Sequence, residues 1–192
     1  MGEAGALNLR IAGFCALLLA LVPGVIFGQG SAIVGACRGR VPNGAYELRW
    51  GDGGPRIVGA FANGRLTGTF IFWTPGGARM ALIPFDNDAK SGTVALWYAA
   101  PDAALEAGRK LEAPYVANRL HGVKRSWQAN GMPRAEYRYQ HGVLVAARGW
   151  TEVGTPISDA AARDLAESDA EADERYYASL LAVVRDNLPA CD

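Results

Sequence analysis

The sequence predicts a mainly β protein, an antiparallel β-meander of repeated hairpins that is followed by a C-terminal amphipathic α-helix. Three observations support this fold class. The 192 residues include 24 glycines, which are spread along the chain at the spacing of tight turns. Tryptophan recurs at near-constant intervals, and the end of the chain carries apolar residues at every fourth position. The length suits one domain better than two.

The first 36 residues have the layout of a secretory signal sequence. An apolar run from Ile11 to Gly28 follows Arg10, and small residues lead up to Ala32 and Ala36. A positive region, an apolar region and a small-residue region in this order are typical of a cleaved signal peptide. We therefore expect cleavage after one of those two alanines and an exported protein, periplasmic or secreted.

Two other interpretations of this region stay open. The run 11–28 is about the minimum length for a membrane-spanning helix, although Pro23 and the glycines disfavour one. The segment Val34-Gly35-Ala36-Cys37 has the composition of a bacterial lipoprotein box, whose cysteine would be lipidated, but it starts well beyond the apolar run. Either arrangement would anchor the protein to a membrane.

The placement of the cysteines predicts one disulfide bond. Cys15 lies within the apolar run, whereas Cys37 and Cys191 stand at the two ends of the mature chain. Thiols of an exported protein tend to pair in its oxidising compartment. We expect a Cys37–Cys191 disulfide that closes a ring around the domain, and two separate buried thiols are the alternative.

Residues 37–157 contain an internal repeat with a period of about 24 residues. The tryptophans are spaced by 23, 24, 30 and 23 residues, and a second aromatic series and a series of small residues are both spaced by 24, 30 and 24. The members are Trp50, Trp73, Trp97, Trp127 and Trp150; Phe61, Phe85, Tyr115 and Tyr139; and Gly68, Gly92, Gly122 and Ala146. Because all three series share one insertion after Trp97, about four copies of one unit are present.

Each copy is predicted to form a strand, a turn, a second strand and a second turn. Pairs such as Asn63-Gly64 supply the positive φ angles of tight hairpins, and segments such as Thr69–Trp73 are rich in β-branched and aromatic residues. Stacked in order, the copies place equivalent residues in ladders across the sheet. We interpret the tryptophans as core and register residues, so Trp73 and Trp97 are expected to be structural. A ligand cage is the alternative, and Tyr98–Gly108 is expected to be an inserted loop.

The repeat resembles a known family. The segment from His121 to Gly131, with Trp127 and the Asn130-Gly131 pair, followed by Tyr137 to Gly142, is similar to MORN repeats of the bacterial variant type. This variant occurs in proteins labelled as antitoxins of the YwqK type. The resemblance covers residues 43–157 and implies a β-meander that serves as a binding scaffold, and the antitoxin label implies a protein partner.

Residues 158–192 are predicted to form an acidic helical tail. Ser168 and Glu171 have the spacing of a capping box, and four apolar residues follow at every fourth position: Tyr176, Leu180, Val184 and Leu188. We expect an amphipathic helix from Ser168 to Pro189 and a separate shorter helix over residues 159–167, capped by Ser158. The apolar stripe is expected to dock on the protein's own sheet, and a partner-binding helix is the alternative.

Charge is balanced overall but not locally. Residues 37–157 hold 15 basic and 9 acidic side chains, whereas residues 158–192 hold 3 and 9. We expect the basic body and the acidic tail to attract each other or to face different partners. The basic residues of the last full repeat form a candidate binding surface: Lys124, Arg125, Arg134, Arg138 and Arg148. A solvated face and a counter-surface for the acidic tail are the other interpretations of these side chains.

The sequence contains no recognisable catalytic, metal or cofactor motif. The two histidines, His121 and His141, each precede a glycine in a predicted turn, and neither metal-ligand spacing nor a phosphate loop occurs. We expect a protein that is not an enzyme, with no cofactor and no nucleic-acid partner. Two hypotheses follow: a scaffold for protein–protein interaction in the cell envelope, and a binder of an anionic envelope component such as lipid headgroups or cell-wall polymer.

Overall fold

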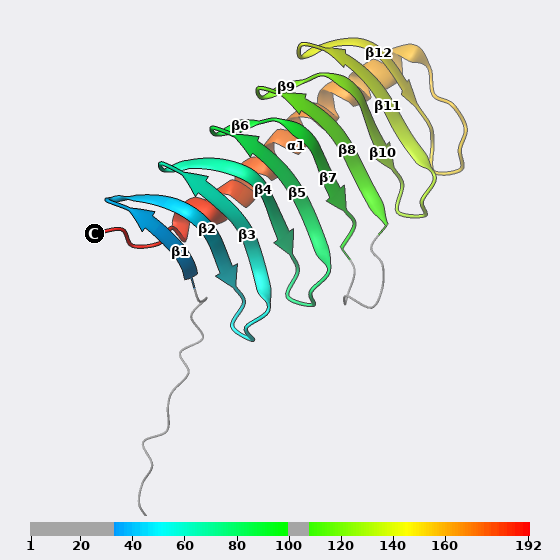
Figure 1. Ribbon diagram of the computed structural model, residues 1–192. Helices are drawn as coiled ribbons and strands as arrows, with labels where there is room; N and C mark the ends of the chain where they lie inside the picture. The colour runs from blue at the N-terminus through cyan, green and yellow to red at the C-terminus, as the bar shows by residue number, and fades with distance from the viewer. Residues whose placement is uncertain (1–32, 100–107) are drawn as a thin grey trace, which may run out of the picture.

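The computed structural model of the protein describes residues 33–99 and 108–192. Ten strands form one antiparallel meander in the order β1-β2-β3-β4-β5-β7-β8-β10-β11-β12, and two short strands, β6 and β9, pair with β5 and β8 (Figure 1). The strands are β1 Ile33–Arg38, β2 Val41–Arg49, β3 Pro55–Ala62, β4 Arg65–Trp73, β5 Arg79–Asp86, β6 Ala89–Lys90, β7 Gly92–Trp97, β8 Arg109–Val116, β9 Arg119–Leu120, β10 Gly122–Trp127, β11 Pro133–Gln140 and β12 Val143–Gly149. One helix, α1 Asp159–Asp186, follows them. The predicted fold class is confirmed.

The hairpins turn where the sequence predicts them. Asn63 and Gly64 have φ angles of 50° and 81°, and His141 and Gly142 have 49° and 89°. Two successive residues with positive φ make the turn whose twist matches that of the flanking strands. His141 is therefore a turn residue, as its position before a glycine predicts.

One face of the sheet, which we call the inner face, holds the apolar core beneath α1. Tyr46, Phe61, Phe70 and Phe85 are buried there, and Phe61 and Phe85 both pack edge-to-face on Phe70 with ring centroids 5.7 Å apart. Edge-to-face packing is a favourable geometry for aromatic pairs. Phe61 and Phe85 of the second aromatic series, with Phe70 between them, thus form an aromatic ladder in the core.

The tryptophans do not belong to this core, so the interpretation of the tryptophan series as core residues is wrong. Trp73 and Trp97 are half-buried and lie outside both core clusters. The Arg109 guanidinium lies 4.5 Å from the centroid of the Trp97 ring and pairs with Glu112 at 2.9 Å. Glu112 directly follows Leu111, a buried residue of the core, so it lies on the opposite face of the sheet, which we call the outer face, and Trp97 is stacked at that face.

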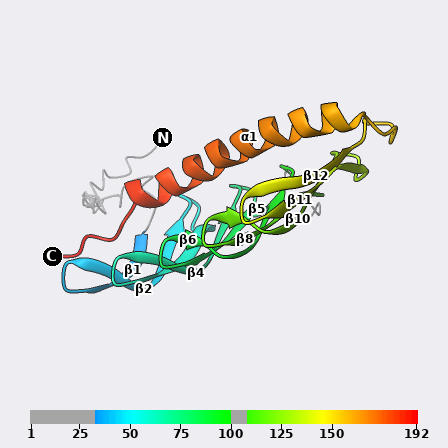
Figure 2. The same cartoon turned by 90° about the horizontal axis from the view of Figure 1, so that it is seen from above.

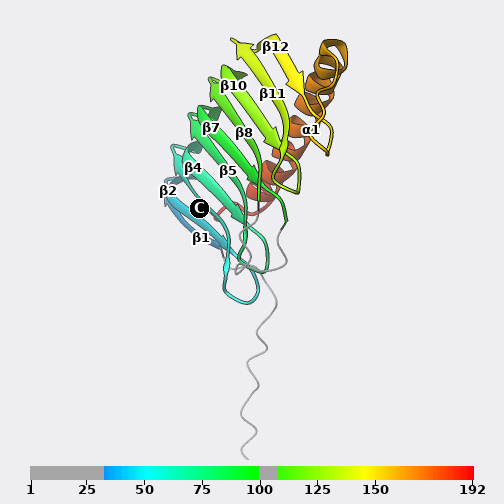
Figure 3. The ribbon, with the colours of Figure 1, turned by 90° about the vertical axis from the view of Figure 1, so that its right-hand side faces the viewer.

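The tail forms one helix, not the two that were expected. α1 runs without interruption from Asp159 to Asp186 and crosses the sheet from β12 back towards β1 (Figures 2 and 3). Ser158 caps its N-terminus by accepting a hydrogen bond from the Ala161 amide. Ser168 lies exposed in the helix interior, so its capping-box spacing does not mark a helix start.

The docking of the helix on the protein's own sheet is confirmed. Tyr177, Leu180 and Val184 are buried in the same cluster as the aromatic ladder, and the Tyr46 hydroxyl donates to the Asn187 carbonyl oxygen at 3.0 Å. Leu188, the last member of the predicted stripe, lies beyond the helix and is 41 % exposed. The C-terminal half of α1 thus closes the inner face over the first repeats.

The predicted disulfide is also confirmed. Cys37 is bonded to Cys191, with their Cα atoms 5.7 Å apart, so the end of the chain is tied to β1. The disulfide is compatible with an exported protein. Residues 1–32 of the predicted signal sequence and most of the Tyr98–Gly108 insertion lie outside the described residues, whereas residues 33–36 of that predicted sequence belong to β1. No helix within 33–99 and 108–192 is long and apolar enough to cross a membrane.

Candidate functional site

The repeats differ at the inner-face positions near the end of the sheet. Tyr46, Phe70 and Val94 occupy one inner-face position in the first three repeats, and Lys124 occupies it in the next. One cross-strand row shows the same change, from Leu48, Phe72 and Leu96 to Ser126. The apolar core therefore gives way to polar groups under the N-terminal half of α1.

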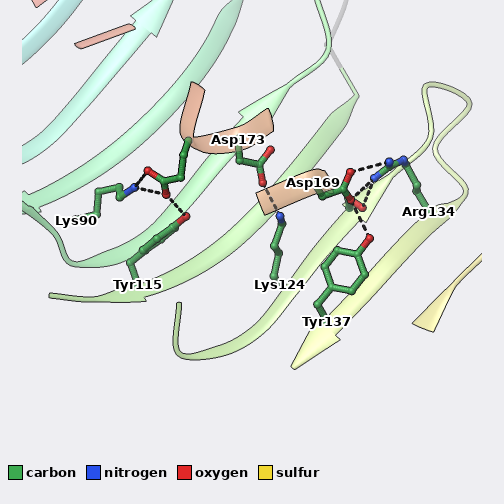
Figure 4. Close-up of polar contacts among 9 residues, drawn as sticks. Lys90, Tyr115, Lys124, Arg134, Tyr137, Asp169 and Asp173 are labelled. Carbon is green, nitrogen blue, oxygen red and sulfur yellow. Dashed lines mark hydrogen bonds and ion pairs between the residues drawn. The ribbon is translucent and has the colours of Figure 1, made fainter. Parts of the chain in front are cut away.

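Lys124 is a buried cation held by the helix. Its side chain is 2 % exposed, and its Nζ lies 2.5 Å from Asp173 Oδ2 (Figure 4). The ammonium also lies 5.5 Å from the centroid of the Tyr137 ring, within cation–π range. Burial raises the pKa of Asp173, while the Lys124 ammonium acts in the opposite direction.

A second pair joins Arg134 to Asp169 on α1. Two guanidinium nitrogens donate to the two carboxylate oxygens at 2.6 and 2.8 Å, and the Tyr137 hydroxyl donates to the same carboxylate at 2.8 Å. Burial acts to raise the pKa of Asp169, but the hydrogen bonds from Arg134 and Tyr137 outweigh it and hold that pKa below its usual value. The fork geometry of this pair fixes the helix at one register on β11.

A third pair lies further along the helix. Lys90 is 7 % exposed and donates to both carboxylate oxygens of Glu174 at 2.5 and 2.6 Å, and the Tyr115 hydroxyl donates to Glu174 at 3.1 Å. The Lys90 ammonium sits over the rings of Tyr115 and Tyr177, with centroids 4.6 and 4.9 Å away. Three cations of the sheet thus meet three carboxylates of one helix, which confirms the predicted attraction between body and tail.

A polar pocket of about 230 Å³ lies beside these pairs, between α1 and strands β8, β10 and β11. It is lined by Tyr98, Lys110, Leu111, Lys124, Ser126, Trp127, Arg134, Asp169, Ala172 and Asp173. Sequence reasoning missed Tyr98, Lys110, Asp169 and Asp173 as site residues. The signal that could have found them is the change at Lys124 and Ser126, since a cation in an apolar column predicts an acidic partner from the tail.

The outer face carries a continuous cross-strand row with two different halves. Its first half begins at Val34 and Glu47 on β1 and β2 and continues through four aliphatic residues, Val58, Ile71, Leu82 and Ala95, which are directly paired across β3, β4, β5 and β7. The row continues on β8, β10, β11 and β12 with alternating charges, at Glu112, Arg125, Glu136 and Arg148. Val58, Ile71 and Leu82 are half-buried although no described element covers them. The four aliphatic residues therefore form an uncovered aliphatic strip on the outer face.

Tryptophan and arginine alternate beside that strip. Trp73 is paired with Arg79 across β4 and β5, and Trp97 with Arg109 across β7 and β8. The guanidinium carbons of Arg79 and Arg109 lie 5.0 and 4.5 Å from the centroid of the Trp97 ring. Stacked guanidinium groups and indole rings make this row a rigid border of the outer face.

The five basic residues of the predicted binding surface do not form one surface. Lys124 and Arg134 pair with α1 on the inner side, which matches the alternative interpretation as a counter-surface for the tail. Arg125 is on the outer face, where it pairs with Glu136 at 3.2 Å. Arg138 and Arg148 are exposed on that face as well. Lys124 and Arg134 are therefore removed from the candidate surface.

The two histidines come together at the turns of neighbouring hairpins. Their ring centroids are 4.8 Å apart, and the His141 amide donates to His121 Nδ1 at 3.3 Å. Within residues 33–99 and 108–192, no group of three or more His, Cys, Asp or Glu side chains is placed to hold a metal ion.

The fold and its contacts define a class of architecture: a single antiparallel meander of repeated hairpins whose inner face is closed by its own C-terminal helix and whose outer face is open. Comparison with protein families, with curated proteins and with solved structures finds no match to this chain.

Proposed function

We propose that the protein is a non-catalytic exported scaffold whose outer sheet face binds a protein partner in the cell envelope. The observation that supports this most is the asymmetry of the sheet. The core, the helix and the three ion pairs between sheet and helix occupy the inner face. On the outer face, the aliphatic strip and the Trp–Arg border have no covering element among the described residues. The Cys37–Cys191 disulfide is compatible with export.

The chemistry of the outer face favours a protein over an anionic polymer. The Trp and Arg side chains that border the aliphatic strip are of the types enriched at protein-binding hot spots. Arg125, which could bind an anion, is neutralised by Glu136 at 3.2 Å. The cross-strand row at this end of the face also carries Glu112, so the charges along that row alternate and sum to zero. The resemblance to MORN repeats supports the same choice, since it implies a binding scaffold.

Site-specific photocrosslinking in the native cell envelope tests the proposal. A photoreactive residue replaces Ile71 in the aliphatic strip, and a control variant carries it at Ala178, which is exposed on α1. We expect one discrete protein adduct from position 71 and none from position 178. The substitution Leu82→Lys, next to Ile71 in the row, should abolish that adduct.

Ionic strength separates this function from binding to an anionic polymer. Contacts between exposed charges weaken as salt rises, whereas burial of aliphatic surface does not. The adduct from position 71 should persist at high salt. Loss of the adduct at high salt, or equal adducts from positions 71 and 178, would contradict a specific protein-binding outer face.

A further inference from the structure

We propose that the polar pocket between α1 and strands β8–β11 binds a small organic anion, one that carries a carboxylate or phosphate group on a short body. This site lies on the inner side of the sheet, so it is separate from the proposed partner-binding face. It would make the fourth repeat a ligand-binding unit within an otherwise structural repeat array.

The first argument comes from the repeat itself. Three copies show that this fold accepts an apolar residue at the Lys124 position, because Tyr46, Phe70 and Val94 are all buried there. Burying an ion pair generally gains no more stability than well-packed apolar residues of similar volume. Lys124 with Asp173 is therefore not required for the packing that the other copies already achieve. Departures from a packing rule of this kind are expected where a protein binds or acts.

The second argument concerns the hydrogen-bond donors. The Lys124 ammonium has three N–H groups, and its carboxylate partner Asp173 contacts it through one oxygen, Oδ2, at 2.5 Å. Lys124 lines the pocket although only 1 % of the residue's surface is exposed to solvent. Lys110 and the hydroxyl of Ser126 line the same space. Together these groups offer donors from two strands to an acceptor placed between them.

The third argument is the charge balance of the pocket. Of its described lining residues, three carry a positive charge and two a negative charge, namely Lys110, Lys124 and Arg134 against Asp169 and Asp173. Arg134 and Asp169 satisfy each other through two hydrogen bonds. The remaining excess is positive and partly enclosed by protein, which concentrates the field and attracts an anion.

The fourth argument is size. The pocket volume of about 230 Å³ lies below the range of roughly 300–1,000 Å³ for drug-sized ligands. Its wall on the helix is the short side chain of Ala172, and Leu111 and Trp127 supply apolar surface from the sheet. The space suits one anionic group with a short, partly apolar body.

Binding is tested on the oxidised protein by titration with sodium phosphate, sodium acetate and sodium butyrate, with sodium chloride at matched ionic strength as the reference. The readout is the backbone amide chemical shift of residues 110–111, 124–127 and 169–173. We expect saturable shifts confined to these segments with phosphate or with the carboxylates. The salt whose chemical-shift changes saturate at the lowest concentration shows whether the site prefers phosphate or a carboxylate.

Three variants make the test specific. Lys110→Ala, at an exposed position, should weaken binding by about tenfold through loss of a charged donor. The double variant Lys124→Leu with Asp173→Leu restores the apolar pattern of the other repeats, so it should fold and bind no anion. Arg125→Ala on the outer face is the control and should bind like the parent. Shifts that match those in sodium chloride, or undiminished binding by the double variant, would overturn the proposal.

Discussion

Single residues in this protein are distinguished by the face of the sheet that they occupy. Phe70 is fully buried on the inner face, whereas Ile71, the next residue, is half-buried on the outer face. A change of the same size therefore has different consequences at neighbouring positions. The sharpest case is a glycine beneath the aromatic ladder.

Gly59→Ala should destabilise the protein by about 1–3 kcal/mol, the usual cost of overpacking a core. A Cβ atom at Gly59 would lie 2.5 Å from the Phe70 ring. Because Phe70 is fully buried, its ring cannot move out towards solvent to relieve the contact. Gly51→Ala is the matched control, since nothing lies within 4 Å of its Cβ position. Urea unfolding of both variants measures the difference, and equal midpoints would contradict the packing described here.

Asp169→Asn should lower the free energy of unfolding at neutral pH by about 2–3 kcal/mol, because charge-assisted hydrogen bonds from Arg134 and Tyr137 are lost. The pKa of Asp169 in the folded protein lies below its ordinary value of 3.8. The stability that it contributes is therefore complete above pH 3.8 and is lost as the pH falls through the lower, folded pKa.

The difference in the free energy of unfolding between the parent and Asp169→Asn should thus stay constant from neutral pH down to the ordinary carboxyl range. It should disappear in stronger acid. Glu171→Gln is the control, since that carboxylate is 67 % exposed and pairs only with Arg175 along the helix. The free energy of unfolding of Glu171→Gln should differ little from that of the parent at every pH. Urea titrations across the acid range supply the measurement, and a difference for Asp169→Asn that persists unchanged in acid would refute the assignment.

The tryptophans show what periodicity alone cannot tell at this scale. Trp73 and Phe72 belong to series with the same period, and a period does not say which face a series occupies. The alternation within Thr69–Phe72 does separate Phe70 and Phe72 from Ile71, whereas the register shift between Phe72 and Trp73 leaves the face of Trp73 undetermined by alternation. Which of the two sets is buried depends on where α1 lies, and that is a tertiary contact that the local sequence does not contain.

At the scale of elements, α1 has two halves that are held by different forces. The C-terminal half packs Tyr177, Leu180 and Val184 into the core. The N-terminal half buries the small side chains of Ala162 and Ala166, packs Leu165 against a second, smaller apolar cluster, and is held by Asp169 and Asp173 on sheet cations. Ser168 and Glu171 have capping-box spacing, but no proline or glycine interrupts residues 158–186. The helix therefore continues through Ser168.

A pair of serine substitutions distinguishes one helix from two. Ser158→Ala should cost about 1 kcal/mol through loss of the N-cap hydrogen bond to Ala161. Ser168→Ala should be neutral or slightly stabilising, because alanine is the better residue in an exposed helix interior. Thermal or urea unfolding measures both. Destabilisation by Ser168→Ala comparable to that by Ser158→Ala would instead support a helix start at residue 168.

At the scale of the whole molecule, the disulfide and the helix close the sheet together. Cys37 and Cys191 are separated by 154 residues, and in the chain-entropy model so long a loop stabilises by at most about 4–5 kcal/mol. The double variant Cys37→Ser with Cys191→Ser should therefore melt at a lower temperature than the oxidised parent. The parent should melt like that variant once it is reduced. Equal melting of the variant and the oxidised parent would show that the bond contributes nothing.

Much of this architecture follows from the sequence because the interactions that specify it are local or periodic. Hairpin turns such as Asn63-Gly64 were predictable on those grounds, and the pairing of Cys37 with Cys191 was predictable because they are the two cysteines outside the predicted signal sequence. The polar pocket was not, because Lys110, Lys124 and Asp173 lie on three different elements. Only the crossing of α1 over β8 and β10 brings them together. The charge imbalance predicted an attraction between body and tail, but not which cations would be buried.

The central structural claim is that α1 is an integral cover of the inner face and not a partner-binding arm. It is tested most directly by removing residues 158–192 in a Cys37→Ser background and comparing that protein with full-length Cys37→Ser/Cys191→Ser by melting temperature and sedimentation velocity. Without α1, the aromatic ladder of Phe61, Phe70 and Phe85 loses its cover, so we expect a lower melting temperature and aggregation. A truncated protein that stays monomeric with an unchanged melting temperature would contradict the claim.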